Sequence, residues 1–492
     1  MALTVDEIIR RNAKIVPDRV AATMDGEILT YRQLDELSDR TATALAAAGI
    51  AFQDRVVTWS DNHLGLVPLF FGLAKLGAVF APLNPRLNPD EAVKLLSLAD
   101  PKLLVVDAAH WEQGGALAKA AGIACLCLDA EPAAHSLPTR AAAAEWRAVR
   151  EPRLEETALQ VLFFTSGSTG APKGVMLSHR ANFLRSFQGE FTERPPRMIC
   201  MFPLFHMSAF TLGLLAWQSL GEITFVKAPT APALLDAVVR RRANHLYCIP
   251  SVWGRVLAED TSRWDLASLH WIDTGTSATP PELIRALKQR FPWALVRVFY
   301  GSTEAGYVTG LFDDEVLAKA GAVGRPGTGV ELRISEAGEI VTRTHYLMDG
   351  YFRNPDATRS ALVDGWYHSG DKGTIDADGH LHVTGRLKDI IRSGGETVAP
   401  TEVEDALRDH PAVAEIAVVG IPDPQWGEVV CAVVVARGEP PALEELRRHA
   451  ESRLASYKMP RRLELVAAIP RTAATAQIQR ALIIERIQSK VS

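Results

Sequence analysis

Cysteine is scarce in this sequence, and charge of neither sign dominates it. The five cysteines are odd in number and scattered, so they predict reduced thiols of a cytoplasmic protein rather than a disulfide framework. Cys125 and Cys127 are spaced like half of a metal site, but no matching second pair is present. A formal net charge of −5 offers no basic surface for nucleic acid or an anionic membrane. The composition predicts neither partner.

Long uninterrupted apolar runs are missing as well. The most apolar stretch, Leu64–Leu83, contains Pro68, Lys75 and Pro82, which favours a buried helix leading into a strand over a transmembrane segment. The first residues include acids where a secretory signal needs bases, so we expect no signal peptide. A peripheral association with membranes stays open.

The chain of 492 residues is too long for one core and predicts two or three domains. Short buried-strand runs alternate with helical patterns such as Asp35–Ala48 and Ala231–Arg242, which is typical of parallel sheets covered by helices. After about Gly321, short strands with Gly and Asp turns predict a β-rich unit. We therefore predict an α/β fold with a large N-terminal domain of two α/β subdomains plus a β-rich subdomain, followed by a small α+β C-terminal domain. The strands predicted for the two α/β subdomains are Arg55–Trp59, Ala78–Pro82, Lys102–Asp107, Ala124–Leu128, Ile223–Lys227, His245–Ile249 and His270–Thr274.

The segment Thr165–Gly174 reads Thr-Ser-Gly-Ser-Thr-Gly-Ala-Pro-Lys-Gly and predicts a polyphosphate site. Its glycines, Gly174 included, let the backbone turn through φ > 0 so that N–H groups point together at an anion, while the hydroxyls and Lys173 add donors and charge. The strand Leu159–Phe164 precedes it and a helix is expected from Ala181, which places the loop at the carboxyl end of a strand. It is not a Walker A loop, because Lys173 is followed by glycine. A plain flexible loop is the alternative.

Four further motifs follow this loop in a fixed order. They are Tyr300-Gly-Ser-Thr-Glu304, Tyr367-His-Ser-Gly-Asp371, Gly385-Arg-Leu-Lys-Asp-Ile-Ile391 and Ser393-Gly-Gly-Glu396. Together with the loop they resemble the adenylate-forming superfamily, which includes acyl-CoA synthetases, carrier-protein adenylation domains and luciferases. The resemblance runs from about Leu29 to the C-terminus, and it implies an enzyme that joins a carboxylate to ATP as an acyl-adenylate.

The resemblance also implies a role for each motif. Thr165 and the residues up to Lys173 would hold the ATP phosphates, and Glu304 would bind Mg²⁺ with Thr165 as the second metal-site residue. Tyr300 would stack on adenine, and Asp371 would accept both ribose hydroxyls, since an ionised carboxylate only accepts hydrogen bonds. The nucleotide- and cofactor-binding residues implied are Thr165, Ser166, Gly167, Ser168, Thr169, Gly170, Lys173, Tyr300, Gly301, Thr303, Glu304, Asp371, Arg386, Lys388, Gly394 and Gly395. The catalytic residues implied are Thr165, Lys173, His206, Glu304, Arg386 and Gln477.

The acid-binding pocket is expected from the same resemblance. His206 matches an aromatic position that gates the carboxylate site in the family, and core packing is the alternative. Phe202–Phe210 contains no aspartate, which disfavours an amino-acid substrate. The expected lining is mostly apolar and suits an aliphatic or aromatic acid. The substrate-contacting residues implied are His206, Ser251, Trp253, Gly275, Thr276, Gly301 and Tyr307.

A second reaction step is implied by the segment Ser393–Glu396. It resembles the loop that opens a passage for the thiol of coenzyme A after the small domain rotates. Lys388 matches the family's hinge, with an ordinary surface lysine as the alternative, so we place the domains at residues 1–387 (AMP-binding) and 388–492 (mobile C-terminal). No carrier domain follows, so free coenzyme A is the expected acceptor; a homo-oligomer stays open.

The resemblance breaks near the C-terminus. The segment Pro470–Arg480 is one residue longer than the family pattern, with Ala476 in place of a glycine and Gln477 in place of a lysine that neutralises the reacting groups. Losing that cation predicts adenylation slower by roughly 10² to 10³ unless another base replaces it. The candidate replacements are Lys458, Arg471 and Arg480. An engineered Lys-to-Gln change and a harmless local shift stay open.

We therefore predict an acyl-CoA synthetase that activates a fatty or aryl carboxylic acid, with ATP, Mg²⁺ and coenzyme A. Gln477 favours an alternative: an adenylation-impaired relative that binds nucleotide or acyl-adenylate, or performs mainly the thioester half-reaction. A third hypothesis is an enzyme that loads a separate carrier protein.

Overall fold

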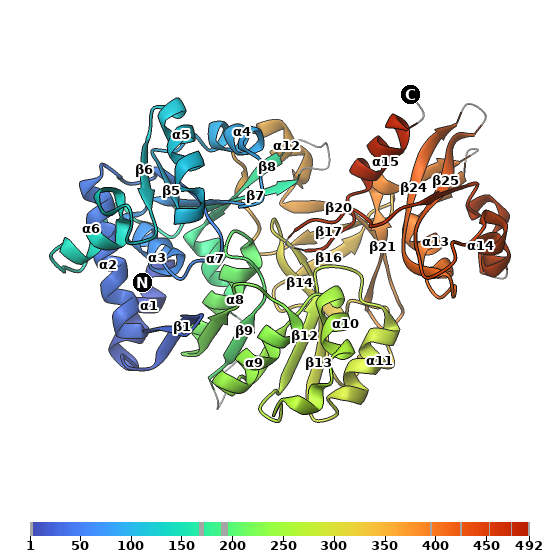
Figure 1. Ribbon diagram of the computed structural model, residues 1–492, viewed down its shortest axis with the longest axis horizontal. Helices are drawn as coiled ribbons and strands as arrows, with labels where there is room; N and C mark the ends of the chain where they lie inside the picture. The colour runs from blue at the N-terminus through green and yellow to red at the C-terminus, as the bar shows by residue number, and fades with distance from the viewer. Residues whose placement is uncertain are drawn as a thin grey trace. The chain divides into compact units, whose positions relative to one another are not determined.

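The computed structural model describes residues 3–166, 172–187, 195–393, 396–423, 426–451, 453–473 and 475–490 (Figure 1). The chain forms two compact units, each described below by itself. The large unit comprises Met1–Ala320, Pro326–Glu331 and Arg343–Tyr367, and the small unit comprises Gly321–Arg325, Leu332–Thr342 and His368–Ser492. The domain boundary at Lys388 stays a prediction.

The first sheet of the large unit has seven strands in the order β18-β8-β7-β4-β3-β5-β6. The strands are β3 (Arg55–Trp59), β4 (Val79–Leu83), β5 (Leu103–Val106), β6 (Ala124–Cys127), β7 (Leu159–Ser166), β8 (Pro172–Ser178) and β18 (Gly350–Tyr351). β7, β4, β3, β5 and β6 run parallel, and α4 (Pro89–Ala99) and α5 (Trp111–Ala121) contribute to its core. The fully apolar strands β4 and β5 are buried along their whole length, as expected of a sheet covered on both faces. The first predicted α/β subdomain is confirmed.

The second sheet has nine strands in the order β15-β14-β13-β12-β11-β9-β10-β1-β2. Its strands are β1 (Val20–Met24), β2 (Glu27–Thr30), β9 (Arg197–Cys200), β10 (Glu222–Phe225), β11 (His245–Tyr247), β12 (Trp271–Gly275), β13 (Leu295–Ser302), β14 (Gly306–Leu311) and β15 (Arg325–Pro326). The three predicted strands of the second subdomain are present as β10, β11 and β12. The sequence did not indicate that the N-terminal strand β1 joins this sheet, parallel to β10 with Ala22 opposite Ile223.

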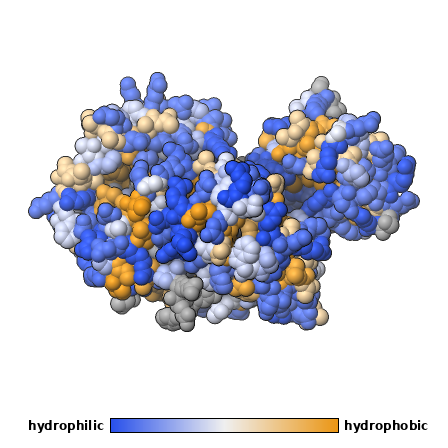
Figure 2. Space-filling view, turned by 60° about the horizontal axis from the view of Figure 1, so that its bottom comes forward, coloured by the Kyte–Doolittle hydropathy of each residue, from blue (hydrophilic) through white to orange (hydrophobic). Residues whose placement is uncertain are grey.

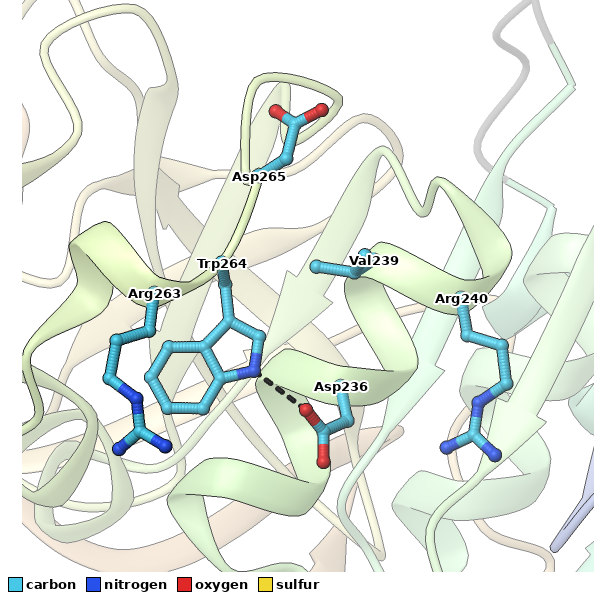
Figure 3. A pocket seen from close by; sticks show the side chains of 6 residues that line it. All are labelled: Asp236, Val239, Arg240, Arg263, Trp264 and Asp265. Carbon is cyan, nitrogen blue, oxygen red and sulfur yellow. Dashed lines mark hydrogen bonds between the residues drawn. The ribbon is translucent and has the colours of Figure 1, made fainter.

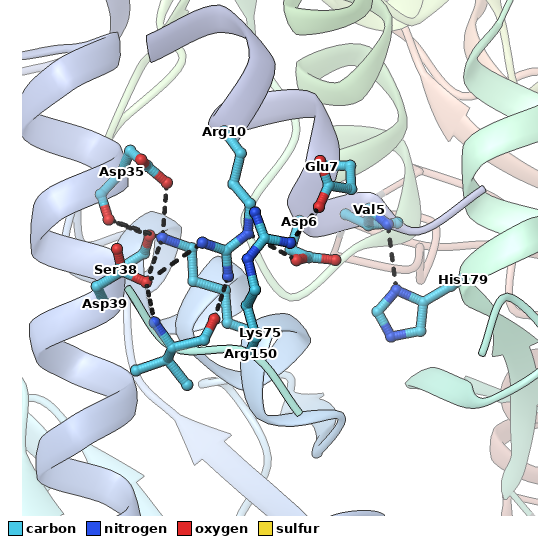
Figure 4. A network of polar contacts seen from close by, with 11 residues as sticks. Val5, Asp6, Glu7, Arg10, Asp35, Ser38, Asp39, Lys75, Arg150 and His179 are labelled. Carbon is cyan, nitrogen blue, oxygen red and sulfur yellow. Dashed lines mark hydrogen bonds and ion pairs between the residues drawn. The ribbon is translucent and has the colours of Figure 1, made fainter. Parts of the chain in front are cut away.

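Buried charges tie three helices of the large unit together (Figure 4). Lys75 on α3 (Leu66–Leu76) is fully buried, and its ammonium lies 2.7 Å from Asp35 and 2.8 Å from Asp39 on α2 (Tyr31–Ala47). Arg10 on α1 (Val5–Ile15) binds Asp6 of the same helix at 2.9 Å and Asp39 of α2 at 3.7 Å. Pairing offsets the cost of removing these charges from water, so the lysine that interrupts the most apolar stretch has a structural partner.

The apolar stretch belongs to the core, because its residues 66–83 are all buried. The face drawn in Figure 2 is mostly hydrophilic, with its hydrophobic side chains in small separate groups. Within the described ranges, no helix has the length and apolar character needed to cross a membrane.

The small unit contains two further sheets. One has the order β16-β17-β20-β19, with β21 paired to β20, and corresponds to the predicted β-rich region. Its strand β19 and the start of β20 are part of the large unit. The other has the order β23-β22-β25-β24, with β26 paired to β25. The strands are β16 (Glu331–Ile334), β17 (Glu339–Arg343), β19 (Leu362–Val363), β20 (Trp366–Ile375), β21 (Leu381–Arg386), β22 (Ile391–Ser393), β23 (Glu396–Val398), β24 (Val413–Asp423), β25 (Gly427–Ala436) and β26 (Arg462–Leu465).

The long β24–β25 ribbon of the small unit is apolar on both faces. Alternate residues such as Val418 and Val430 pack with α13 (Pro400–Leu407) and α14 (Leu443–Ala450), while Ala417 and Cys431 pack with α15 (Arg480–Ser489). A strand pair covered by helices on both faces has its own core, which confirms the predicted small α+β region.

Candidate active site

The predicted phosphate segment begins on an antiparallel hairpin. Thr165 at the end of β7 lies opposite Lys173 at the start of β8. Strand β8 separates the loop from α7 (His179–Ser186). The sequence predicted a helix from Ala181 but no strand between the loop and that helix. The predicted residues Gly167, Ser168, Thr169 and Gly170, and the side chain of Ser166, lie outside the described residues.

The prediction for Gly174 was wrong. Gly174 does not turn through positive φ but pairs with Phe164 inside the β7–β8 ladder. A Cβ at this position would lie 2.8 Å from Cδ1 of Leu162. Glycine here leaves room for the Leu162 side chain of the neighbouring strand and does not form the turn.

One tyrosine links the predicted phosphate lysine to the predicted metal-binding acid. The hydroxyl of Tyr351 donates to Oε1 of Glu304 at 3.0 Å, and Nζ of Lys173 lies 4.8 Å from the centre of the Tyr351 ring. Tyr351 belongs to β18, which pairs with β8 so that Tyr351 faces Val175, two residues after Lys173. We call these three residues the Tyr351 cluster. Residues 173, 304 and 351 are distant in sequence, and the fold brings their side chains together.

The Tyr300–Glu304 motif forms the end of β13 and the turn into β14. The ladder shifts register between Tyr300 and Gly301, and a Cβ on Gly301 would lie 2.1 Å from the carbonyl oxygen of Gly306. The bulge turns the chain sharply, and only glycine fits at Gly301. Tyr300, Thr303 and Glu304 are each partly exposed.

A buried arginine binds backbone carbonyls of this turn and of the segment near it. Nη1 of Arg185 on α7 donates to the carbonyl of Thr303 at 2.9 Å, and Nη2 donates to the carbonyl of Tyr346 at 2.8 Å. Arg185 is 3% exposed, and burial lowers its pKa to about 10, although nearby Glu304 and Asp349 favour the charged form. Sequence analysis missed this residue, because an arginine in an amphipathic helix ordinarily lies at the surface.

His206 is partly buried at the start of α8 (Met207–Gln218). Its Nδ1 accepts the N–H of Ser208 at 3.2 Å, and its ring stacks with Phe202 at a centroid distance of 5.7 Å. Burial lowers the pKa of His206 to about 4. The imidazole is therefore neutral near pH 7 and adds an aromatic face without a positive charge.

The carboxyl end of β12 has an unusual backbone. Gly275 has φ of +148°, and a Cβ there would lie 2.1 Å from the carbonyl oxygen of Phe299. The next residue, Thr276, has φ of +70°, which is rare for a β-branched side chain. The hydroxyls of Thr276 and Tyr247 lie 3.3 Å apart. Such local strain is often found at functional sites, and the contact of Gly275 and Thr276 with substrate stays a prediction.

The other predicted substrate residues differ in exposure. Trp253 is fully buried, and its indole N–H donates to the carbonyl of Asp273 at 2.8 Å. Ser251 is exposed near the start of α10 (Pro250–Ala258). The Tyr307 ring is partly exposed and lies 5.6 Å from that of Phe299. In this structure Trp253 packs in the core, so its contact with substrate stays a prediction.

The small unit contains the predicted ribose-binding and hinge residues. Asp371 on β20 lies opposite Arg386 on β21, and their charged groups form an ion pair at 3.0 Å. Lys388 follows in a short 3₁₀ helix, Leu387–Asp389, where burial lowers its pKa against the opposing effect of Asp389. Gly394 and Gly395 lie outside the described residues.

The segment around Gln477 is a compact turn, which we call the Gln477 turn (residues 471–473 and 475–480). The N–H of Thr472 donates to the carbonyl of Gln477 at 2.8 Å, and the N–H of Gln477 donates to the hydroxyl of Thr472 at 3.0 Å. Ala476 has φ of +53°, in the left-handed region that glycine adopts without strain. Alanine thus occupies a conformation suited to the glycine of the family pattern.

The three cations proposed to replace the missing lysine are all paired. Arg471 binds Glu415 at 2.9 Å, and Lys458 binds Glu402 at 2.5 Å. Arg480 binds Glu404 at 2.5 Å and Asp389 at 3.3 Å. Each would have to exchange a carboxylate for a phosphate to act in adenylation.

A surface pocket away from these residues is lined by parts of α9 (Ala231–Arg241) and by residues 263–265, which follow α10 (Figure 3). The indole N–H of Trp264 donates to Asp236 across it at 2.7 Å. Its lining residues were not among the predicted site residues, and they are Asp236, Val239, Arg240, Arg263, Trp264 and Asp265.

Comparisons with known proteins cover both units. A family model described as AMP-binding enzyme matches residues 9–352, and one described as AMP-binding enzyme C-terminal domain matches residues 402–475. A feruloyl-CoA synthase of Amycolatopsis is 34% identical over 484 residues, which cover 94% of this chain and 95% of the relative. A long-chain-fatty-acid–CoA ligase of Mycobacterium tuberculosis is 31% identical over 507 residues, which cover 98% of each chain. The crystal structure of an ATP-bound RpMatB-BxBclM chimera superposes with a TM-score of 0.91 at 26% identity over 100% of both chains.

Proposed function

Because the chain belongs to the family of AMP-binding enzymes, we propose that it is an acyl-CoA synthetase, an ATP-dependent and AMP-forming ligase of a fatty or aryl carboxylic acid with coenzyme A. The relatives that match nearly its full length are named as ligases of this kind, for an aryl and for a fatty acid. The geometric observation that carries the proposal is the Tyr351 cluster, in which one tyrosine has the ammonium of Lys173 over its ring and the carboxylate of Glu304 at its hydroxyl, at the predicted phosphate site.

The reaction has two steps. A carboxylate oxygen of the acid attacks the α-phosphorus of ATP, the bond from that phosphorus to the bridging oxygen breaks, and pyrophosphate leaves. The sulfur of coenzyme A, having lost its proton, then attacks the acyl carbon, and AMP leaves. Such chemistry depends on positioning and on neutralising charge at phosphate oxygens.

The residues of the large unit suit the first step. Lys173 supplies positive charge for the β- and γ-phosphates beside the hydroxyl of Thr165, on the opposite strand of the hairpin. Tyr300 offers a partly exposed ring for adenine, and Thr303 a hydroxyl for the α-phosphate. His206, neutral near pH 7, admits the carboxylate without trapping it in an ion pair.

The donor set fits Mg²⁺. Glu304 is a hard oxygen ligand, partly exposed, and among the described residues only one of its two carboxylate oxygens accepts a side-chain hydrogen bond. Glu304, with Thr165, would hold the ion, which supplies charge neutralisation at the phosphate oxygens when bound.

The residues of the small unit suit ribose and hinge roles. Asp371 accepts the ribose hydroxyls once Arg386 moves to ribose or phosphate, and Lys388 is the hinge of the mobile C-terminal domain. The loop containing Gly394 and Gly395 admits the thiol of coenzyme A. The five cysteines, all free thiols, support a cytoplasmic location.

The alternative of an adenylation-impaired relative is not favoured by the similar proteins, which are named as synthases or ligases. Because Gln477 replaces the family's lysine, the adenylation of free acids is the step to test. Product formation from free acids with ATP, Mg²⁺ and coenzyme A is compared with formation from synthetic acyl-adenylates, across acetate, palmitate, benzoate and ferulate. Turnover from free acids supports the complete synthetase. Turnover only from acyl-adenylates contradicts the complete synthetase and supports an enzyme of the thioester half-reaction. If product forms only when a carrier protein is added, free coenzyme A is not the acceptor.

A further inference from the structure

Tyr351 is a buried side chain that no motif of the sequence analysis included. It is 7% exposed, and its backbone is fixed twice: β18 pairs with β8, and its N–H donates to the hydroxyl of Thr358 at 2.9 Å. The strand that positions it is the strand on which Lys173 lies. Movement of the phenol relative to Lys173 is therefore restricted by the sheet itself.

The phenol makes two different contacts with the proposed ATP site. Its hydroxyl donates to Glu304 at 3.0 Å, and its ring face lies 4.8 Å from the ammonium of Lys173. A hydrogen bond also joins its side chain to that of Tyr367, the first residue of the Tyr367–Asp371 motif. A phenol has an ordinary pKa of about 10, so the hydroxyl keeps its proton near pH 7 and remains a donor.

These contacts have separable consequences. A hydrogen bond to one carboxylate oxygen fixes the orientation of Glu304 and leaves the other oxygen for a cation; partners of this kind set the affinity of a metal ligand. An aromatic face attracts an ammonium without consuming its N–H donors, so Lys173 remains able to bind phosphate oxygens.

We infer that Tyr351 is a positioning residue that orients Glu304 for the divalent cation and Lys173 for the phosphates of ATP. The inference rests on the proposed function, and it assigns the two jobs to two parts of one side chain. The hydroxyl contributes to the ATP affinity that depends on the metal ion, and the ring contributes to the ATP affinity that does not.

Two substitutions separate these parts. Tyr351→Phe removes the hydroxyl and keeps the ring, whereas Tyr351→Leu removes both. The readout is the equilibrium affinity for a non-hydrolysable ATP analogue, measured by calorimetry with Mg²⁺ and with EDTA. For Tyr351→Phe we expect affinity about 10- to 100-fold weaker with Mg²⁺ and unchanged in EDTA. For Tyr351→Leu we expect a loss in both conditions.

Tyr31→Phe provides the matched control, because the hydroxyl of Tyr31 donates to the buried carbonyl of Gly221, away from the site. It should bind the analogue as the unmodified protein does, with a comparable change in melting temperature. A Tyr351→Phe protein that binds normally at every Mg²⁺ concentration, or that loses equal affinity with and without Mg²⁺, overturns the positioning role. If the unmodified protein fails to bind the analogue, the proposed function itself is overturned.

Discussion

Lys173 in the large unit and Arg471 in the small unit are both candidate partners for ATP, and the fold holds them in different ways. Lys173 lies over the ring of Tyr351 at 4.8 Å, whereas Arg471 is bound to the carboxylate of Glu415 at 2.9 Å. An aromatic face leaves the donors of a cation available, while a carboxylate occupies them. If both regions bind ATP as proposed, Lys173 can do so with its donors available, whereas the Gln477 turn would first have to give up the ion pair of Arg471.

Removing the charge of Lys173 or of Glu304 should have the largest effect on the rate of adenylation. Lys173→Ala and Glu304→Gln should each slow pyrophosphate release from ATP and free acid by roughly 10² to 10³, because each deletes a preorganised charge at the reacting phosphates. Thioester formation from a synthetic acyl-adenylate should change far less, since that step involves no pyrophosphate. Lys227→Ala, at an exposed lysine, is the control. Equal losses in both half-reactions would argue against a phosphate role for these residues.

Acid should weaken the large unit selectively. His179 is fully buried, its Nδ1 accepts the N–H of Val5 at 3.2 Å, and burial lowers its pKa to about 4 against the opposing charge of Asp6. The unfolded chain binds this proton near pH 6.5, so the stabilisation is complete above that pH and is lost as pH falls toward 4. We expect a loss of about 3 kcal/mol in the free energy of unfolding.

The measurement is urea unfolding at pH 7, 5.5 and 4.5, with His179→Asn as the comparison. Asparagine keeps an acceptor for Val5 but does not titrate, so the loss between pH 7 and 4.5 should shrink. In the small unit, by contrast, Arg453 and then His449 lower the pKa of Asp409, and this contribution to stability is lost only below about pH 4, outside the measured range. A pH dependence unaltered by His179→Asn would assign the acid sensitivity to other groups.

Restoring a cation to the Gln477 turn tests the comparison between Lys173 in the large unit and Arg471 in the small unit. Gln477→Lys should speed adenylation by about 10²-fold, since one charged donor at the reacting phosphate has roughly that effect. Gln477→Met, which is similar in size and uncharged, should not speed it. Thioester formation from a synthetic adenylate should be equal in all three proteins. No gain from the lysine would mean that adenylation already uses another base, with Arg471, Lys458 and Arg480 as the candidates.

Much of this architecture could be predicted from the sequence, for a physical reason. The runs that became β3, β4, β5 and β10 are short and apolar with clear boundaries, so local pattern was sufficient. Lys173 and Glu304 were proposed from ordered motifs, and their roles stay predictions. Tyr351 was not, because a strand of two residues, Gly350–Tyr351, has no periodicity, and its partner β8 is distant in sequence. Arg185 was missed because its partners are backbone carbonyls, which have no sequence signature.

The smallest predicted effect concerns Ala476. Its φ of +53° places an L-residue with a Cβ in the left-handed region, which costs roughly 1–2 kcal/mol, while glycine loses somewhat more chain entropy on folding. Ala476→Gly should therefore raise the free energy of unfolding by about 1 kcal/mol. The matched control is Ala144→Gly, because Ala144 has φ of −71° and gains nothing from glycine. If Ala476→Gly also speeds adenylation, strain in the turn contributes to the effect of Gln477; if only stability rises, the missing charge alone limits this region. Combining Ala476→Gly with Gln477→Lys distinguishes these two causes, since independent effects on the rate multiply and coupled ones do not.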